Sequence, residues 1–332
     1  MRADRVFAYG ATAGLIGDRI LGDPRRGHPV AAFGRAAAAV ERSLWGDDRA
    51  RGLLHTLVCA GGAAAVGALG ARAVRSRPAA ARIALTAAAT WAVVGGTSLG
   101  REARAIAGAL AAGDVEVARE RLPHLCGRDP QSLDGQQMAR AVVESVAENT
   151  SDAVVGALVW GAAAGVPGLL AFRAVNTLDA MVGHKSPRYL RYGWASARLD
   201  DLAGWPGARL TAVAAVLAGP DRRGAVRAWR ADAAAHPSPN AGPVEASFAG
   251  ALGVRLGGTL AYGGRVEHRA VLNGEAGRPV EVADIERAVR LSRQVTWLAL
   301  GACVAARLLV SRTTGRTRTT RTARTTRRGR RG

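Results

Sequence analysis

Lysine is almost absent from this sequence. Lysine and arginine together number 46, and Lys185 is the only lysine among them. Biased codon usage accounts for such a composition, so the scarcity by itself identifies no function. It draws attention to residues 176–201, NTLDAMVGHKSPRYLRYGWASARLDD, where the lysine lies among aspartates, a histidine and aromatic residues.

Cysteine is also scarce, and the common catalytic signatures are missing. The three cysteines, Cys59, Cys126 and Cys303, are far apart and lack metal-ligand spacing, which excludes a disulfide framework and favours a reducing compartment or membrane burial. The string VGHKS is not a phosphate-binding loop, because His184 interrupts the required Gly-Lys sequence. The sequence has no catalytic-triad signature or glycine-rich dinucleotide loop.

Acidic residues are absent from the C-terminal segment 311–332, which contains nine arginines. It has no apolar periodicity, so we expect a disordered arginine-rich tail after a single membrane-embedded domain at 1–310. A basic tail suggests nucleic acid, but no helix-turn-helix, zinc finger or aromatic RNA-binding signature accompanies it. We therefore predict no nucleic-acid partner, and the basic tail after an apolar stretch favours a membrane.

Long apolar stretches are what the sequence does contain. Charge-poor segments approach the ~20 residues that cross a bilayer as a helix. The candidates are 53–71, 83–99, 153–172, 202–219 and 295–310, with 6–21 a weaker one. The alternative is a set of buried helices in a soluble protein, but so many are hard to bury in one core of this size. The predicted fold class is all-α: a multi-pass integral membrane protein with about five apolar spans or re-entrant segments.

Patterned polar segments lie between the apolar ones. The sequence predicts two short amphipathic helices around Gly113 in residues 101–122 and one helix in residues 134–152. Residues 220–294 form the longest polar region. We expect these segments to be water-facing helices and layers beside the membrane.

Three carboxylates share one predicted helix face. Glu144, Glu148 and Asp152 are spaced four residues apart in ESVAENTSD. A solvated helix face is the simpler interpretation. Three acids without an interleaved base at a membrane boundary instead favour Mg²⁺, which binds a few carboxylates together with substrate phosphates.

The segment around the lone lysine adds both signs of charge. Asp179, Asp200 and Asp201 supply further oxygen ligands, while Lys185, Arg188, Arg191 and Arg198 supply positive charge for phosphate. His184 is a candidate general base, although a lone histidine more often has a structural role.

Two loops complete the set of candidates. The turn-rich segment HPSPNAG presents His236, Ser238 and Asn240 before a predicted helix, or is a plain connecting loop. The stretches GDPRRGHPVAAFGR and CGRDP, which contains Arg128, add further charged groups.

The order of these motifs resembles the CobD/CbiB family of cobalamin biosynthesis, the adenosylcobinamide-phosphate synthases. The resemblance covers residues 6–310, and its most specific parts are AENTSD, NTLDAMVGHK, SARLDD and HPSPNAG. It implies a multi-pass protein of the cell membrane, with its active face in the cytoplasm. It also implies an enzyme that joins aminopropanol, as its O-phosphate, to the remaining propionate of adenosylcobyric acid. The bond is an amide, ATP and Mg²⁺ are implied, and other enzymes of the pathway are candidate partners.

Roles within that resemblance are assigned from charge. We expect catalytic roles for one group of residues: Asp179, His184, Lys185 and Asp201. We expect binding of substrate or phosphate by another: Arg128, Arg198, Arg209, His236, Ser238 and Asn240. Mg²⁺ is assigned to Glu144, Glu148, Asp152 and Asp200, although Asp179, Asp200 and Asp201 are an alternative set.

A topological difficulty remains. AENTSD and NTLDAMVGHK flank the apolar stretch 153–172, and a straight span would place them on opposite sides of the bilayer. The sequence Gly165-Val-Pro-Gly168 can break a helix, so we predict a re-entrant or broken segment here. A corrinoid-binding scaffold or transporter is the alternative function, but acids concentrated at span ends favour surface chemistry.

Overall fold

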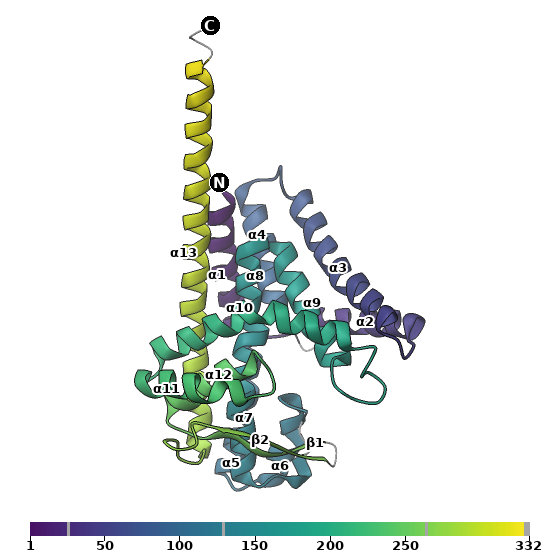
Figure 1. The fold of residues 1–332 in the computed structure, drawn as a ribbon, viewed down its shortest axis with the longest axis vertical. Coiled ribbons are helices and arrows are strands. Elements are labelled where there is room, and N and C mark those ends of the chain that lie inside the picture. Colours follow the sequence, from purple (N-terminus) through teal and green to yellow (C-terminus); the bar gives the residue numbers. More distant parts are fainter. Residues whose placement is uncertain (25–26, 128–129, 263–264, 329–332) are drawn as a thin grey trace.

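The computed structural model describes residues 1–332 except 25–26, 128–129, 263–264 and 329–332. Figure 1 shows a set of upright helices above a second set that runs crosswise, with a third, lower group beneath. The upright helices are α1 (Ala3–Leu21), α3 (Arg49–Ala73), α4 (Ala79–Val93), α8 (Gly156–Ala164), α9 (Val166–Val182) and α13 (Val282–Arg328). The crosswise helices are α10 (Trp194–Ala218), α11 (Arg222–Asp232) and α12 (Ala241–Leu252).

The lower group contains α5 (Gly96–Ala111), α6 (Val115–Arg121), α7 (Gly135–Asn149) and a β-hairpin, while α2 (Pro29–Leu44) packs beside α3 and α9. The expected pair of short helices is confirmed, because α5 and α6 separate at Gly113, whose φ is 77°. Helix α7 confirms the helix expected in the next polar segment. Asp134 begins it with a capping box, in which Gln137 N donates to the Asp134 carboxylate at 2.7 Å.

In the part of the chain that the structure describes, three helical segments are long and apolar enough to cross a membrane: Arg49–Ala73, Ala79–Ala111 and Val282–Ser311. They contain three of the five stretches expected from the sequence, so the membrane character is supported and the count of five is not confirmed. The stretch 153–172 is divided between two short helices. The stretch 202–219 lies in α10, which carries Arg209 and Pro206 and runs crosswise in Figure 1.

The break expected at Gly165–Gly168 is confirmed. Gly165 takes a φ of 72° and ends α8, and Pro167 lies in the first turn of α9, where its missing N–H costs nothing. Helices α8 and α9 pack against each other. A Cβ at Gly168 would overlap the carbonyl oxygen of Trp160 on the neighbouring helix, so the close approach requires glycine here. The stretch is therefore a helical hairpin that returns the chain to the side from which it came.

Arg307 on α13 stabilises the end of α8. Its Nη1 donates to the carbonyl oxygens of Gly161 at 2.9 Å and Ala162 at 2.5 Å. These carbonyls belong to the last turn of the helix, where the Gly161 oxygen also accepts from the backbone N–H of Gly165 at 2.8 Å. A cation at a helix C-terminus also interacts favourably with the helix dipole. The third candidate span thus caps the tip of the hairpin.

The core consists of two connected apolar clusters. One fills the lower and crosswise layers around Ile106, Met138 and Phe248. The other lies among the upright helices around Phe7 and Leu169. Val159 and Leu210 pack against both clusters, so the apolar interior is continuous between the layers.

Two expectations about secondary structure differ from the fold. The protein is not purely α-helical, because β1 (Leu256–Tyr262) and β2 (Arg265–Leu272) pair antiparallel in the region expected to be a polar layer. The paired Gly257 and Gly258, with φ of 79° and 84°, occupy an irregularity in the register and favour a bent strand over a helix.

The arginine-rich tail is the second difference. It is helical through Arg328, where we expected disorder, because it contains no proline and extends α13 without the cost of a new helix nucleus. The domain boundary at 310 stays a prediction.

Candidate functional site

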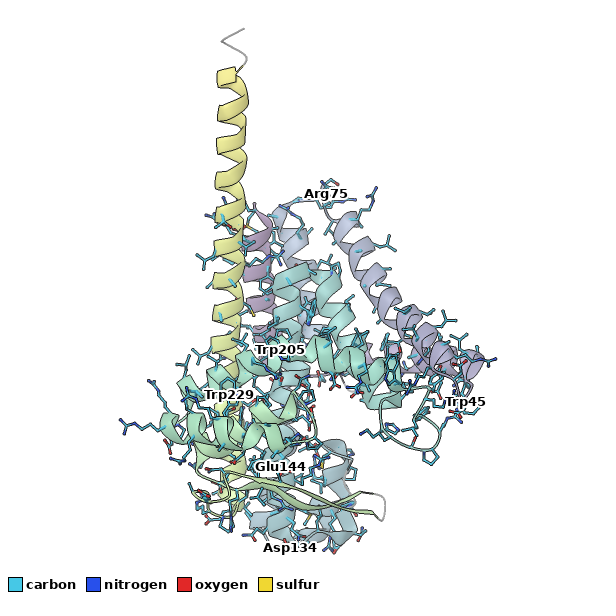
Figure 2. The ribbon with its side chains drawn as sticks, viewed as in Figure 1. Trp45, Arg75, Asp134, Glu144, Trp205 and Trp229 are labelled. Carbon is cyan, nitrogen blue, oxygen red and sulfur yellow. The ribbon has the colours of Figure 1, made fainter. Side chains whose placement is uncertain are left out.

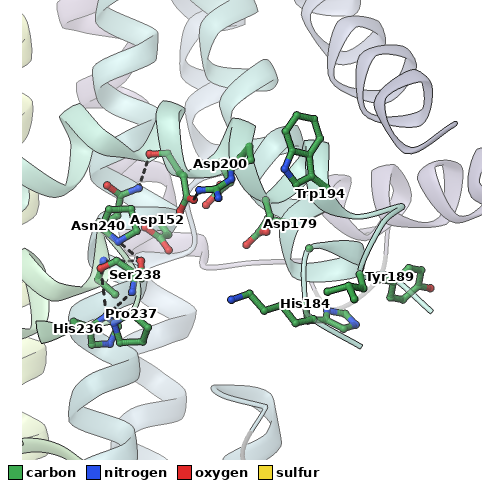
Figure 3. Close-up of a pocket in the computed structure, with 18 of the residues that line it drawn as sticks. Asp152, Asp179, His184, Tyr189, Trp194, Asp200, His236, Pro237, Ser238 and Asn240 are labelled. Atoms are coloured by element: carbon green, nitrogen blue, oxygen red, sulfur yellow. Dashed lines mark hydrogen bonds and ion pairs between the residues drawn. The ribbon is translucent and has the colours of Figure 1, made fainter. Parts of the chain in front are cut away.

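A large open cavity of about 1040 Å³ lies where the crosswise layer meets the end of the α8–α9 hairpin. Figure 3 shows carboxylates at its centre, between the loop of His236 and Ser238 on one side and that of His184 and Tyr189 on the other. The lining includes eleven of the residues to which the sequence analysis assigned a role: Glu148, Asp152, Asp179, His184, Lys185, Arg198, Asp200, Asp201, His236, Ser238 and Asn240. Motifs separated by about 100 positions in sequence therefore meet at one place.

The hairpin explains this convergence. Glu148 lies at the end of α7, and Asp152 follows in a π-helical turn, η3 (Thr150–Val155), just before α8. Asp179 lies near the end of α9, after the chain has reversed at Gly165. Because α8 and α9 run in opposite directions, the motifs before and after them lie on the same side. The π-turn, a rare feature that is frequent at functional sites, directs Asp152 into the cavity.

The carboxylates of the cavity perturb one another. Burial raises the pKa of Asp152 well above its usual value, and the charge of Glu148 adds to the effect. Burial, followed by the charge of Asp179, raises the pKa of Asp200 to about 7. The pKa of Asp179 is also raised, first by burial and then by Asp201. Such a cluster favours a bound proton or a bound cation.

Basic side chains surround the acids. Lys185 and His184 are exposed to the cavity, and Nη1 of Arg198 lies 3.6 Å from the Asp201 carboxylate. Arg49 and Arg269 also line the cavity, and sequence reasoning missed both. Arg49 is the first residue of α3 and Arg269 belongs to β2, so only the fold could place them here. The site therefore combines a basic rim with an acidic centre.

The loop before α12 is built from its own hydrogen bonds. His236 Nδ1 accepts from Ser238 N at 3.0 Å, and the Ser238 hydroxyl accepts from Ala241 N at 3.1 Å. Burial lowers the pKa of His236, which keeps the imidazole neutral. Asn240 extends outward from this loop and donates from Nδ2 to the carbonyl oxygen of Asp201 at 2.8 Å. The loop and the Asp200–Asp201 pair are thus joined directly.

Arg209 does not line the cavity, contrary to its expected role in binding phosphate. Its Nη1 donates to Asn240 Oδ1 at 2.8 Å, and its guanidinium lies 4.7 Å from the centre of the Trp205 ring. Arg209 lies two helical turns beyond Asp201 on α10, which places it behind Asn240. The hydrogen bond from Arg209 orients the Asn240 side chain.

Glu144 is also outside the cavity, although it was expected to bind metal with Glu148 and Asp152. It is 3% exposed, and its Oε1 accepts from Gly257 N at 2.6 Å beneath the β-hairpin. Residues at i and i+8 diverge on an α-helix, and the π-turn at Thr150 changes the register further. The three carboxylates therefore do not form one ligand set.

The loop that carries His184 and Lys185 is anchored to α2. Glu41 accepts hydrogen bonds from the Tyr189 hydroxyl at 2.9 Å and from Arg188 at 3.1 Å. The Arg188 guanidinium also lies 4.6 Å from the Trp45 ring centre, and Figure 2 shows Trp45 beside this loop. Sequence reasoning missed Glu41, which follows the conspicuous GDPRRGHP stretch without belonging to it.

Among the residues that the structure describes, no three His, Cys, Asp or Glu side chains surround a common metal position. Mg²⁺ does not require such a cage, because it commonly binds one or two carboxylates and completes its shell with water and phosphate oxygens. The clustered Asp152 and Asp200 meet that requirement. Arg128, also expected at the site, lies outside the described residues.

The fold and cavity define a helical membrane protein with a polar site at the ends of its spans. The sequence pattern of the family described as "CobD/Cbib protein" matches residues 11–292, and the chain belongs to that family. It is 54% identical to the cobalamin biosynthesis protein CobD of Mycobacterium tuberculosis over 309 residues, which cover 92% of this chain and 96% of the relative.

A more distant relative gives the same result. The chain is 42% identical to the protein of the same name from Chromobacterium violaceum, with 89% of this chain and 95% of the relative covered. No solved structure matches this chain.

Proposed function

We propose that this protein acts in cobalamin biosynthesis as an ATP-dependent amide-forming enzyme. It would join aminopropanol, as its O-phosphate, to the remaining propionate of adenosylcobyric acid. The product is adenosylcobinamide phosphate. Family membership supports the pathway, and the mixed charge of the cavity supports the reaction class.

One observation carries the proposal: the α8–α9 hairpin places Asp152 and Asp179 at a single cavity. ATP is available only in the cytoplasm, so a site divided by the bilayer would be inactive. With both motifs on one side of the cell membrane, the whole active site can face the cytoplasm, where ATP is present. Other enzymes of the pathway would then have access to the same face to deliver the amine.

Binding follows from the two kinds of charge. Lys185, Arg198 and Arg269 provide positive charge for the phosphates of the nucleotide and of the amine substrate. Asp152 and Asp200 would hold Mg²⁺ together with nucleotide phosphates. When bound, Mg²⁺ neutralises phosphate charge. The cavity is also wide enough to admit part of a large substrate such as a corrinoid.

The overall reaction balances with one proton released. ATP, a carboxylate and an ammonium group give an amide, ADP, phosphate and a proton. A carboxylate is a poor acyl donor, so transfer of the terminal phosphoryl group to its oxygen supplies a leaving group. The amine nitrogen then attacks the acyl carbon as phosphate departs. Asp179 lines the same cavity and is not assigned to Mg²⁺, and burial raises the pKa of its carboxyl, so this residue is placed to accept the ammonium proton.

The test is an assay of the full-length protein in detergent with adenosylcobyric acid, Mg²⁺, ATP and aminopropanol phosphate. We expect one equivalent of ADP for each new corrinoid amide, identified by mass. Unphosphorylated aminopropanol in a parallel reaction determines whether the phosphate is required. The Asp152→Asn variant serves as a matched inactive control. Folded protein that retains corrinoid but forms no amide would contradict the proposal and support a scaffold or transporter.

A further inference from the structure

A second cavity lies between α10 and α11, and none of the described residues that line it also lines the acidic cavity. Its volume is about 390 Å³, and its lining is mainly apolar: Val213, Val216, Leu217, Val226 and Trp229, with Arg230. An adjoining hollow of about 420 Å³ shares Val216, Val226 and Arg230 and adds Arg222, Arg223 and Arg227. Together they form an apolar groove with a basic rim, which we call the α10–α11 groove.

The positive charge of this rim is not neutralised locally. Helix α11 has four arginines in 11 residues. The neighbouring acids accept hydrogen bonds from backbone N–H groups: Asp221 from Gly224 at 2.7 Å and Asp232 from Asn273 at 2.6 Å. Within the described part of the chain, no carboxylate lies within 4.0 Å of these four guanidinium groups. The rim is therefore available to an anion.

The groove lies at a level that suits a lipid headgroup. In Figure 1, α10 runs across the ends of the upright helices, among them candidate membrane spans. One face of α10 exposes large apolar side chains: Leu202, Trp205, Val213 and Leu217, from 43% to 73% exposed. A helix that lies across the spans with an exposed apolar face is typical of the membrane interface, and tryptophan is enriched there. Trp205 and Trp229 mark this side of the molecule in Figure 2.

We propose that the α10–α11 groove binds an anionic phospholipid. The acyl chain would contact Leu217, Val226 and Trp229, and the headgroup phosphate would contact Arg223 and Arg227. Guanidinium groups bind phosphate with paired hydrogen bonds, and basic clusters beside a span attract anionic lipid. An acidic peptide would satisfy the arginines but not the apolar groove. This inference is independent of the proposed catalytic activity.

Quenching of Trp229 fluorescence tests the proposal. The full-length protein is reconstituted in phosphatidylcholine nanodiscs, and dibrominated phosphatidylglycerol or dibrominated phosphatidylcholine replaces increasing fractions of the lipid. Subtracting the signal of the Trp229→Phe variant isolates Trp229 from the other tryptophans. We expect quenching to reach half its maximum at a mole fraction of brominated phosphatidylglycerol at least ten-fold lower than that of brominated phosphatidylcholine. The reason is that each arginine raises the affinity for an anionic lipid about five-fold.

The Arg223→Gln/Arg227→Gln variant should lose most of this preference. A matched control, Arg75→Gln/Arg77→Gln, removes the same charge from the α3–α4 turn, and Figure 2 shows Arg75 at the opposite end of the upright helices. Its quenching curves should equal those of the wild type. Coincident curves for the two lipids, or an equal loss in the control variant, would overturn the proposal. Displacement by a polyglutamate peptide, without lipid preference, would assign the groove to a protein partner and reject the lipid.

Discussion

The hydroxyl of Tyr189 donates to the carboxylate of Glu41 at 2.9 Å and connects positions 148 residues apart. This contact holds the loop of His184 and Lys185 against α2. Arg188 reinforces it through the same carboxylate oxygen, so one buried acid determines where the loop lies. The loop of His184 and Lys185 therefore depends on a helix that supplies none of the described residues lining the cavity.

Substitution of Glu41 by glutamine should impair catalysis without unfolding the protein. The amide can still accept from Tyr189 but loses its charge for Arg188, a change worth about 1.5–3 kcal/mol for a hydrogen bond to a charged group. We expect amide formation to fall about ten-fold, mainly in kcat. Glu116→Gln, which removes an exposed acid beside Arg119, should have no effect. Equal rates for Glu41→Gln and wild type would show that the loop is held by other contacts.

Lys185→Arg should keep activity within about three-fold, because a fixed positive charge is enough for phosphate binding. Asp179→Ala should lower the rate at least about 100-fold, since it removes a carboxylate from the centre of the cavity. Steady-state kinetics of both variants provide the comparison. An inactive arginine variant would instead indicate that Lys185 acts through its deprotonated amine.

A methyl group at Gly183 should also impair activity, although less than loss of the Asp179 carboxylate. A Cβ at this position would overlap the Asp179 carboxylate and displace it. We expect Gly183→Ala to lose at least about ten-fold in activity, because the Asp179 carboxylate has to move and the Asp179 carbonyl oxygen, 2.8 Å from the added Cβ, has to shift as well. Gly62→Ala is the matched control, since no atom lies within 4 Å of its added Cβ. Normal activity of Gly183→Ala would show that the Asp179 position is not critical.

Asp200 should destabilise the protein as pH rises. Folding raises its pKa from 3.8 to about 7, so the folded state binds more protons and the free energy of unfolding falls between pH 4 and pH 7. Asp200→Asn should therefore stabilise the protein at pH 8, by on the order of 2 kcal/mol, and have little effect at pH 4. Thermal unfolding in detergent with EDTA measures this difference.

The exposed acid Glu120 gives the control, because Glu120→Gln should not change stability at either pH. A stabilisation by Asp200→Asn that is equal at pH 4 and pH 8 would refute the assigned shift in pKa. Addition of Mg²⁺ at pH 8 should raise the melting temperature of the wild type more than that of Asp200→Asn, because the cation relieves the same repulsion.

The hairpin makes a topological prediction. Single cysteines at Gln136 on α7 and at Pro187 should react with an impermeant maleimide from the same side of the membrane. A cysteine at Ser76 should react from the other side, because Figure 1 places the α3–α4 turn at the opposite end of the upright helices. Labelling of intact cells and inverted vesicles, corrected for wild-type background, measures the accessibility. Opposite sides for positions 136 and 187 would exclude the re-entrant hairpin.

The sequence by itself determined the helical membrane class, the order of the motifs and the break at Gly165–Gly168. These features depend on local properties: apolar length, and the inability of proline and glycine to continue a helix. The motif order also led to the correct family. Even so, apolar length did not distinguish a true span from α10, because hydrophobicity does not specify direction relative to the bilayer.

Only the tertiary structure decided which charged groups meet. The π-turn at Thr150 separates Glu144 from the cavity, and helix position places Arg209 behind Asn240. Arg49 and Arg269 reach the site from elements distant in sequence. Spacing along one helix predicts a shared face only while the helical register is regular. Contacts between elements depend on packing, which no single segment encodes.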